Sequence, residues 1–189
     1  MFEMITEYLT HLFNKSAFVE QDKNTHYDHV INGSYKAEDT EIEMNLCING
    51  QAVLGKNVRV EKKLLVNGRF IAHQSTLMSD LTVNGASSLD NTQINGDAKF
   101  RGSLETASTT FTNKIEILSS LAELENSKTQ LITFKELPRH NVVQRLKLKK
   151  NTEVHGDIIF EAGNGEVLCD ETSKVHGKVI GGKLIQSHG

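Results

Sequence analysis

Two histidines near the C-terminal end are the residues of this chain whose spacing best suits metal chemistry. His155 and His176 lie 21 residues apart in the similar segments TEVHGD and SKVHGK. If these segments lay side by side, the two imidazoles would be close enough to share a cation. Protein zinc sites typically use about three or four side-chain ligands. Two histidines without a further ligand or a carboxylate are an incomplete set, so we predict no metal site and no cofactor.

The carboxylates in the middle of the chain could act as general acids or bases only if they met in pairs. A glycoside hydrolase or a lyase needs paired carboxylates, or a base with an arginine, on one face of neighbouring structural repeats. Asp90, Asp97 and Glu105 are scattered candidates, and no aromatic platform for a sugar accompanies them. A carbohydrate-active enzyme therefore stays an alternative, while no catalytic residue is predicted.

The two cysteines, Cys47 and Cys169, are far apart in the sequence. Two cysteines in a chain of 189 residues do not make a disulfide framework. We expect both to be buried thiols in a reducing compartment.

A repeat of about 17 residues determines how all of these residues are positioned. Apolar residues recur in one column of this repeat, at Ile31, Ile48, Val66, Val83, Phe100, Ile117 and Phe134. A regular period shorter than that of helical repeats is typical of a solenoid in which each repeat is one turn of a coil.

Each repeat has the pattern of a strand followed by a tight corner. Apolar and polar residues alternate in the segments LTV, AKF and IEI, as expected of a strand with one buried face. An Asn-Gly pair follows in four repeats, and both residue types tolerate positive φ. We therefore predict an all-β, single-stranded parallel β-helix. Further inward positions are expected at Leu77, Ile94, Leu104, Phe111 and Leu121, with Ser, Thr, Asn and Asp outside.

The predicted β-helix domain spans residues 28–189, with about eight or nine coils at the strand spacing of ~4.8 Å. Residues 1–15 form a predicted amphipathic helix, and residues 16–27 are a linker. The helix would cap the open end of the solenoid, contact a membrane, or bind a partner helix. Its apolar side comprises Phe2, Ile5, Leu9, Leu12 and Phe13. The N-terminus resembles neither a signal peptide nor a membrane span, so we expect a cytoplasmic protein.

The register breaks at ELPRHNVVQ, which contains the only proline, Pro138. Proline cannot supply a ladder hydrogen bond, so we predict an inserted loop at about 135–150. This loop is basic, and it includes Arg139, Arg145, Lys147, Lys149 and Lys150. It is interpreted as a solvated protrusion, with an acidic protein or an anionic membrane surface as the alternative partner. Nucleic acid is disfavoured because no aromatic residue is interleaved with the cations.

The segments LTVNGASSLDNTQINGDAKFRGSLETASTTF and TEVHGDIIFEAGNGEVLCDETSKVHGKVIGG resemble the bactofilins, which are bacterial polymer-forming cytoskeletal proteins. The similarity is one of repeat pattern and extends over residues 30–184. It implies a right-handed, three-faced β-helix. It also implies subunits that join end to end, through exposed apolar terminal coils, into nucleotide-free filaments that act as scaffolds, often at the inner membrane.

The function predicted from the sequence is that of a non-enzymatic scaffold that self-associates through the ends of its β-helix. The expected interface comprises Val175, Val179, Ile180 and Leu184. If the N-terminal helix plugs one end, a dimer through the C-terminal end replaces the filament. The first alternative is a partner-binding module that uses the basic loop or a ladder face. A left-handed hexapeptide acyltransferase is disfavoured because the coil has about 17 residues, whereas that fold has a strict coil of about 18.

Overall fold

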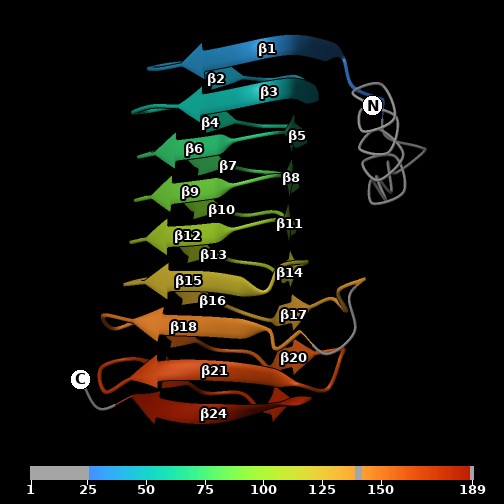
Figure 1. Ribbon diagram of the computed structural model, residues 1–189. Helices are drawn as coiled ribbons and strands as arrows, with labels where there is room; N and C mark the ends of the chain where they lie inside the picture. The colour runs from blue at the N-terminus through green and yellow to red at the C-terminus, as the bar shows by residue number, and fades with distance from the viewer. Residues whose placement is uncertain (1–25, 139–141, 188–189) are drawn as a thin grey trace, which may run out of the picture.

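The computed structural model describes residues 26–138 and 142–187, which wind into a rod of nine stacked coils (Figure 1). Every strand pairs in parallel with strands of the neighbouring coils. The predicted all-β, parallel β-helix is therefore confirmed. No helix occurs within the described residues, and the predicted cap formed by Phe2, Ile5, Leu9, Leu12 and Phe13 lies outside them.

Three strands per coil build three faces. The first face is formed by β5 (Leu64–Asn67), β8 (Leu81–Asn84), β11 (Ala98–Arg101), β14 (Ile115–Ile117), β17 (Ile132–Phe134), β20 (Ile158–Phe160) and β23 (Val179–Ile180). The second face is formed by β6 (Phe70–His73), β9 (Ser87–Asp90), β12 (Leu104–Ala107), β15 (Leu121–Glu125), β18 (Arg145–Lys149), β21 (Gly165–Asp170) and β24 (Gly182–Ser187).

The third face consists of eight two-residue strands. These are β2 (Glu41–Ile42), β4 (Arg59–Val60), β7 (Thr76–Leu77), β10 (Gln93–Ile94), β13 (Thr110–Phe111), β16 (Lys128–Thr129), β19 (Glu153–Val154) and β22 (Lys174–Val175). In the first two coils, β1 (His29–Ala37) and β3 (Leu46–Leu54) run unbroken across the first and second faces, so these two faces form one sheet of 16 strands.

The direction of winding is visible in Figure 1. The strands of the second face run from right to left at the front, and the third face lies behind them. Because the N-terminal coil is at the top, the chain turns clockwise as it moves away from a viewer at that end. The β-helix is therefore right-handed, which excludes the left-handed hexapeptide fold.

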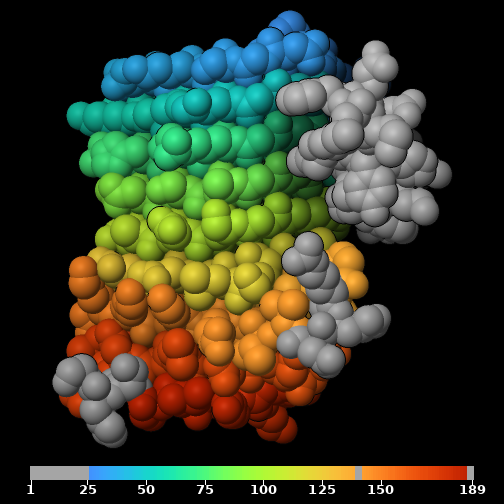
Figure 2. Space-filling model, viewed as in Figure 1, coloured from blue at the N-terminus to red at the C-terminus, as the bar shows by residue number. Residues whose placement is uncertain are grey.

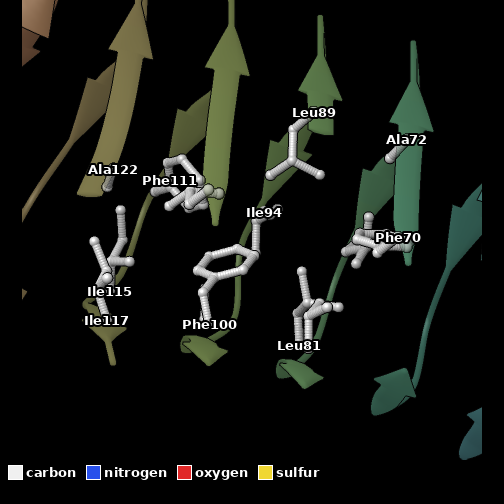
Figure 3. Packing of buried hydrophobic residues seen from close by; sticks show 14 of the residues in the cluster. Phe70, Ala72, Leu81, Leu89, Ile94, Phe100, Phe111, Ile115, Ile117 and Ala122 are labelled. Atoms are coloured by element: carbon white, nitrogen blue, oxygen red, sulfur yellow. The ribbon is translucent and has the colours of Figure 1, made fainter. Parts of the chain in front are cut away.

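The apolar column predicted from the sequence is the central column of the core. Ile31 pairs with Ile48, Ile48 with Val66, and so on to Phe134, which pairs with Phe160 of the next coil. Figure 3 shows how the side chains of successive coils fill the interior. Phe134 and Phe160 stack with ring centroids 4.7 Å apart. The side chains of the column are almost completely buried from Ile48 to Phe160, and Ile31 in the first coil is partly buried. Each such side chain contributes about 1.5–3 kcal/mol of transfer free energy.

One predicted inward residue is wrong. Leu121 is 40% exposed, and Ala122 pairs with Leu104 in its place. The step from Leu104 to Ala122 is 18 residues, one more than the common period. Because side chains alternate across a strand, a shift of one residue moves the whole set to the other face.

Asparagine and glycine columns form the corner between the first and second faces. Each asparagine donates from Nδ2 to Oδ1 of the asparagine in the coil before it, with distances of 2.7–2.9 Å from Asn32 to Asn84. Arg101 continues the ladder by donating to Asn84 Oδ1 at 3.2 Å. The neighbouring glycines have positive φ and lie so close together that a Cβ on Gly85 would collide with the carbonyl oxygen of Gly68.

A column of buried hydroxyl groups forms the corner between the second and third faces, where we expected outward polar residues. Its members are Ser75, Thr92, Thr109, Ser127, Thr152 and Ser173, all at most 6% exposed. The hydroxyl typically donates to the carbonyl two residues earlier, as Thr92 does to Asp90 at 3.0 Å. The residue between often has positive φ, as Asn91 does. This internal hydrogen bond allows a hydroxyl group to be buried there.

The predicted basic loop is shorter than expected. The chain leaves the coil between β17 and β18, at residues 135–144, and Arg145 already begins a strand. At the base of this excursion, the buried Gln144 donates from Nε2 to the carbonyls of Ser119 and Lys135, at 3.0 and 2.9 Å. Phe134 and Phe160 remain paired across it.

The crowding of the glycine column can be tested with two substitutions. Gly85→Ala should lower the free energy of unfolding by at least about 3 kcal/mol, because it adds overpacking to backbone strain. Gly33→Ala is the matched control, since Gly33 also has positive φ but a Cβ there meets no atom within 4 Å. It should cost only about 1–2 kcal/mol. Urea denaturation measures both, and equal losses would contradict the crowding argument.

Candidate functional site

The carboxylates considered for catalysis do not form one site. Asp90 and Glu105 line a shallow hollow on the second face, together with Glu123 and Glu125. Figure 2 shows the stacked coils in a space-filling view. Asp97 lies between the third and first faces, where its Oδ2 atom forms an ion pair with Lys114 Nζ at 3.3 Å.

The acidic residues of the hollow are largely engaged in ion pairs. Lys149 Nζ lies 2.6 Å from Glu123 Oε1, and Lys147 lies 3.5 Å from the other oxygen of the same group. The hydrogen bond from Lys149 holds the pKa of Glu123 below its ordinary value. A general acid at neutral pH needs a raised pKa, so Glu123 is unsuited to protonate a leaving group.

Three of the basic residues predicted to protrude, Arg145, Lys147 and Lys149, belong to strand β18 of the second face, and Lys150 follows it directly. The register places Lys147 beside Glu123 and Lys149 beside Glu125, both on β15. Arg145 lies 2.8 Å from Glu166, and Lys150 lies 2.6 Å from Glu125. Arg139 lies outside the described residues. These four residues therefore form ion pairs within the rod, and the interpretation as a free basic protrusion is wrong for them.

The last two coils place the predicted assembly residues at two kinds of position. Val175 and Val179 are partly buried and pack against the core. Leu184 continues the inner column of the second face below Val167 and is 44% exposed. Ile180 pairs with Ile159 on the outward side of the first face and is 45% exposed.

The two ends of the rod are its unpaired strand edges within the described residues. β24 pairs only with β21, and β1 pairs only with β3. The inner column that ends at Val179 is apolar in every coil except the first, where His29 occupies it. The C-terminal end is therefore the more apolar of the two in this column.

His155 and His176 lie side by side, as their matching segments suggested. Their rings are stacked at a centroid distance of 5.1 Å with an interplanar angle of 6°. Glu153 Oε2 lies 3.5 Å from His155 Nε2. The sequence pattern had missed this carboxylate. The signal that could have found it is the alternation around Val154, which places residues 153 and 155 on the same side of the strand.

Both cysteines are buried and free, as expected. Burial raises the pKa of each thiol, so the thiolate is disfavoured at neutral pH. Neither cysteine is suited to act as a nucleophile.

Asp170 closes the turn after β21. It accepts hydrogen bonds from the backbone N–H of Lys150 at 2.7 Å and of Ser173 at 2.8 Å, and from the Thr172 hydroxyl at 2.9 Å. Burial acts to raise the pKa of Asp170, but these hydrogen bonds outweigh it and lower the pKa to about 2. The carboxylate therefore links two coils and has a structural part.

Comparisons with protein-family models, with curated proteins and with solved structures found no match. Among the described residues, no helix has the length and apolar character needed to cross a membrane.

The role of Asp170 predicts a pH-dependent contribution to stability. Because its folded pKa is depressed, its stabilisation is complete above the unfolded value of about 3.9 and is lost as the pH falls through about 2. Asp170→Asn should cost about 1–2 kcal/mol at pH 7, and the difference from the unsubstituted protein should shrink below pH 4.

Denaturant titrations at several pH values measure this difference. Glu161→Gln is the control, since Glu161 forms one exposed ion pair with Lys135 and should cost less than about 1 kcal/mol. A cost for Asp170→Asn that stays constant from pH 7 to pH 2 would show that its charge does not matter.

Proposed function

We propose that the protein is a non-enzymatic structural protein that self-associates through the C-terminal end of its β-helix. The observation that carries the proposal is the unpaired edge of β24, a strand that includes the exposed inner residue Leu184. A free strand edge offers a row of unpaired N–H and C=O groups to another chain. Pairing this edge with that of a second copy would satisfy these groups and would bury the Leu184 side chains of both copies at the contact.

The C-terminal end is preferred over the N-terminal end on chemical grounds. Val179 and Leu184 end their inner columns with apolar side chains, whereas His29 places a polar group at the equivalent of Val179 in the first coil. Two C-terminal ends can meet across a two-fold axis, which gives a closed dimer. Joining the C-terminal end to the N-terminal end would give an open filament.

The ion pairs of the second face support a non-catalytic, structural role for the body of the rod. Its carboxylates and amines neutralise one another in stacked ion pairs, and the lowered pKa of Glu123 opposes acid catalysis. The same pairing argues against the basic residues as a docking site, because a partner would first have to displace Glu123 and Glu125. These observations favour self-association over the partner-binding and carbohydrate-active alternatives.

The resemblance to the bactofilins agrees with this proposal. A right-handed, three-faced β-helix with about 17 residues per coil is the architecture that the resemblance implies, and end-to-end assembly is its implied function. We infer a bactofilin-like scaffold that acts in the cytoplasm, with peripheral attachment at the inner membrane as one setting.

The proposed interface predicts a selective loss of assembly. Leu184→Lys should convert the associated protein to a monomer, because a charge would be buried at the contact. Leu121→Lys is the matched control: Leu121 is 40% exposed, close to the 44% of Leu184, but it lies in the middle of the rod. Light scattering coupled to size-exclusion chromatography measures the mass, and electron microscopy at several salt concentrations reveals filaments.

A third variant separates the two modes of assembly. Tyr35 is the first residue of the inner column that ends at Leu184, and it packs against the core at the N-terminal end. Tyr35→Lys therefore changes the opposite end of the rod. It should leave a C-terminal dimer intact and would disrupt a filament built head to tail. A protein that is strictly monomeric under every condition would overturn the proposed function.

A further inference from the structure

The outward side of the third face carries one cluster of metal-binding groups. Val154 points into the core and is fully buried, so Glu153 and His155 on either side of it both point outward. Val154 pairs with Val175 of the next coil, which brings His176 beside His155. The candidate ligand atoms of Glu153, His155 and His176 all lie within 4.8 Å of one another.

These three groups have no evident part in holding the coil together. The side chains of Glu153 and His155 are 36% and 42% exposed, and His176 is exposed as well. The stacked imidazoles are neighbours because parallel strands lie ~4.8 Å apart, and the inner valines supply the packing beneath them. The fold therefore brings the three groups together on one surface, where a ligand can reach them.

We propose that Glu153, His155 and His176 form a binding site for a divalent transition-metal ion of the zinc class. Imidazole and carboxylate donors together suit Zn²⁺, Cu²⁺ and Ni²⁺, whereas Ca²⁺ and Mg²⁺ prefer sites made of oxygen ligands alone. Three protein ligands leave the last tetrahedral position to water. The two histidines alone were an incomplete set of metal ligands, and the Glu153 carboxylate adds the third ligand.

Binding requires a modest movement of the side chains. A tetrahedral zinc ion with bonds of ~2.0–2.1 Å holds its ligand atoms roughly 3.3 Å apart. The ligand atoms must therefore approach one another by up to roughly 1.5 Å from their separation of up to 4.8 Å, and the parallel rings must tilt. The side chains of Glu153 and His155 are 36% and 42% exposed, which leaves room for these rotations at the surface.

Two lysines limit the affinity. The register places Lys128 and Lys174 on either side of Glu153 in its outward column. Their charges oppose a cation, so we expect a dissociation constant of about 1–100 μM, in contrast to the tight binding of structural zinc sites. The same argument predicts that removing a lysine charge strengthens binding.

Isothermal titration calorimetry of the full-length, chelator-treated protein with Zn²⁺ tests the site. One ion per chain should bind, and His155→Ala and His176→Ala should each weaken binding at least tenfold. Lys174→Gln should tighten it several-fold. His73→Ala is the matched control, because His73 faces a single carboxylate, Asp90, at 2.7 Å and should not contribute.

A second measurement tests the site independently of the calorimetry. Zn²⁺ should raise the melting temperature of the unsubstituted protein and of His73→Ala, and leave that of the double variant His155→Ala/His176→Ala unchanged. Zinc binding that survives in the double variant, or no binding by the unsubstituted protein at millimolar Zn²⁺, would overturn the proposal. Because the groups lie on the outer surface, the variants should fold, and circular dichroism checks this.

Discussion

Vertical stacking of equivalent residues at the spacing of paired strands is the constraint on which this structure depends. Each coil is too thin to bury its own apolar side chains, so Val83 is covered only because Val66 and Phe100 lie on either side of it. The backbone hydrogen bonds also run from one coil to the next, along the axis of the rod. Each inner coil therefore completes its packing and its backbone hydrogen bonds through its neighbours, whereas the first and last coils each lack one neighbour.

The same stacking determines the chemistry of the surface. A side chain that points outward has like neighbours above and below, which suits amides but is costly for like charges. The asparagine ladder from Asn32 to Asn84 shows the first case. On the second face, acidic β15 is followed by basic β18, so that Glu125 lies between neutral Ala107 and positive Lys149. Glu123 has the like charge of Glu105 on one side, and Lys147 on its other side offsets it. Charges on this rod are arranged for mutual neutralisation over much of the second face.

Much of the fold could be predicted from the sequence because its strongest signals are periodic. The column from Ile31 to Phe134 and the Asn-Gly corners follow directly from spacing. Positions set by a change of period could not be assigned: Leu121 faces outward because one extra residue precedes Ala122, and the basic strand β18 was hidden by the excursion before it.

Residues whose environment differs from their type also escaped prediction. The buried hydroxyls of Thr92 and Thr109 look like surface residues in the sequence, and only the carbonyls that they bond to at the corner permit their burial. The histidine pair could be predicted from matching segments. Glu153 could not be recognised as its third member until the direction of Val154 was known, because strand direction decides which neighbours share a side.

The excursion at residues 135–144 shows that the length of one corner is not tied to the geometry of the coils. It adds chain to a single coil, yet Phe134 and Phe160 remain paired on one side of it, and Leu124 and Leu148 on the other. A change in the length of this connection would therefore leave both adjoining layers in place. The paired strands on either side therefore hold the two ends of the excursion at one height along the rod.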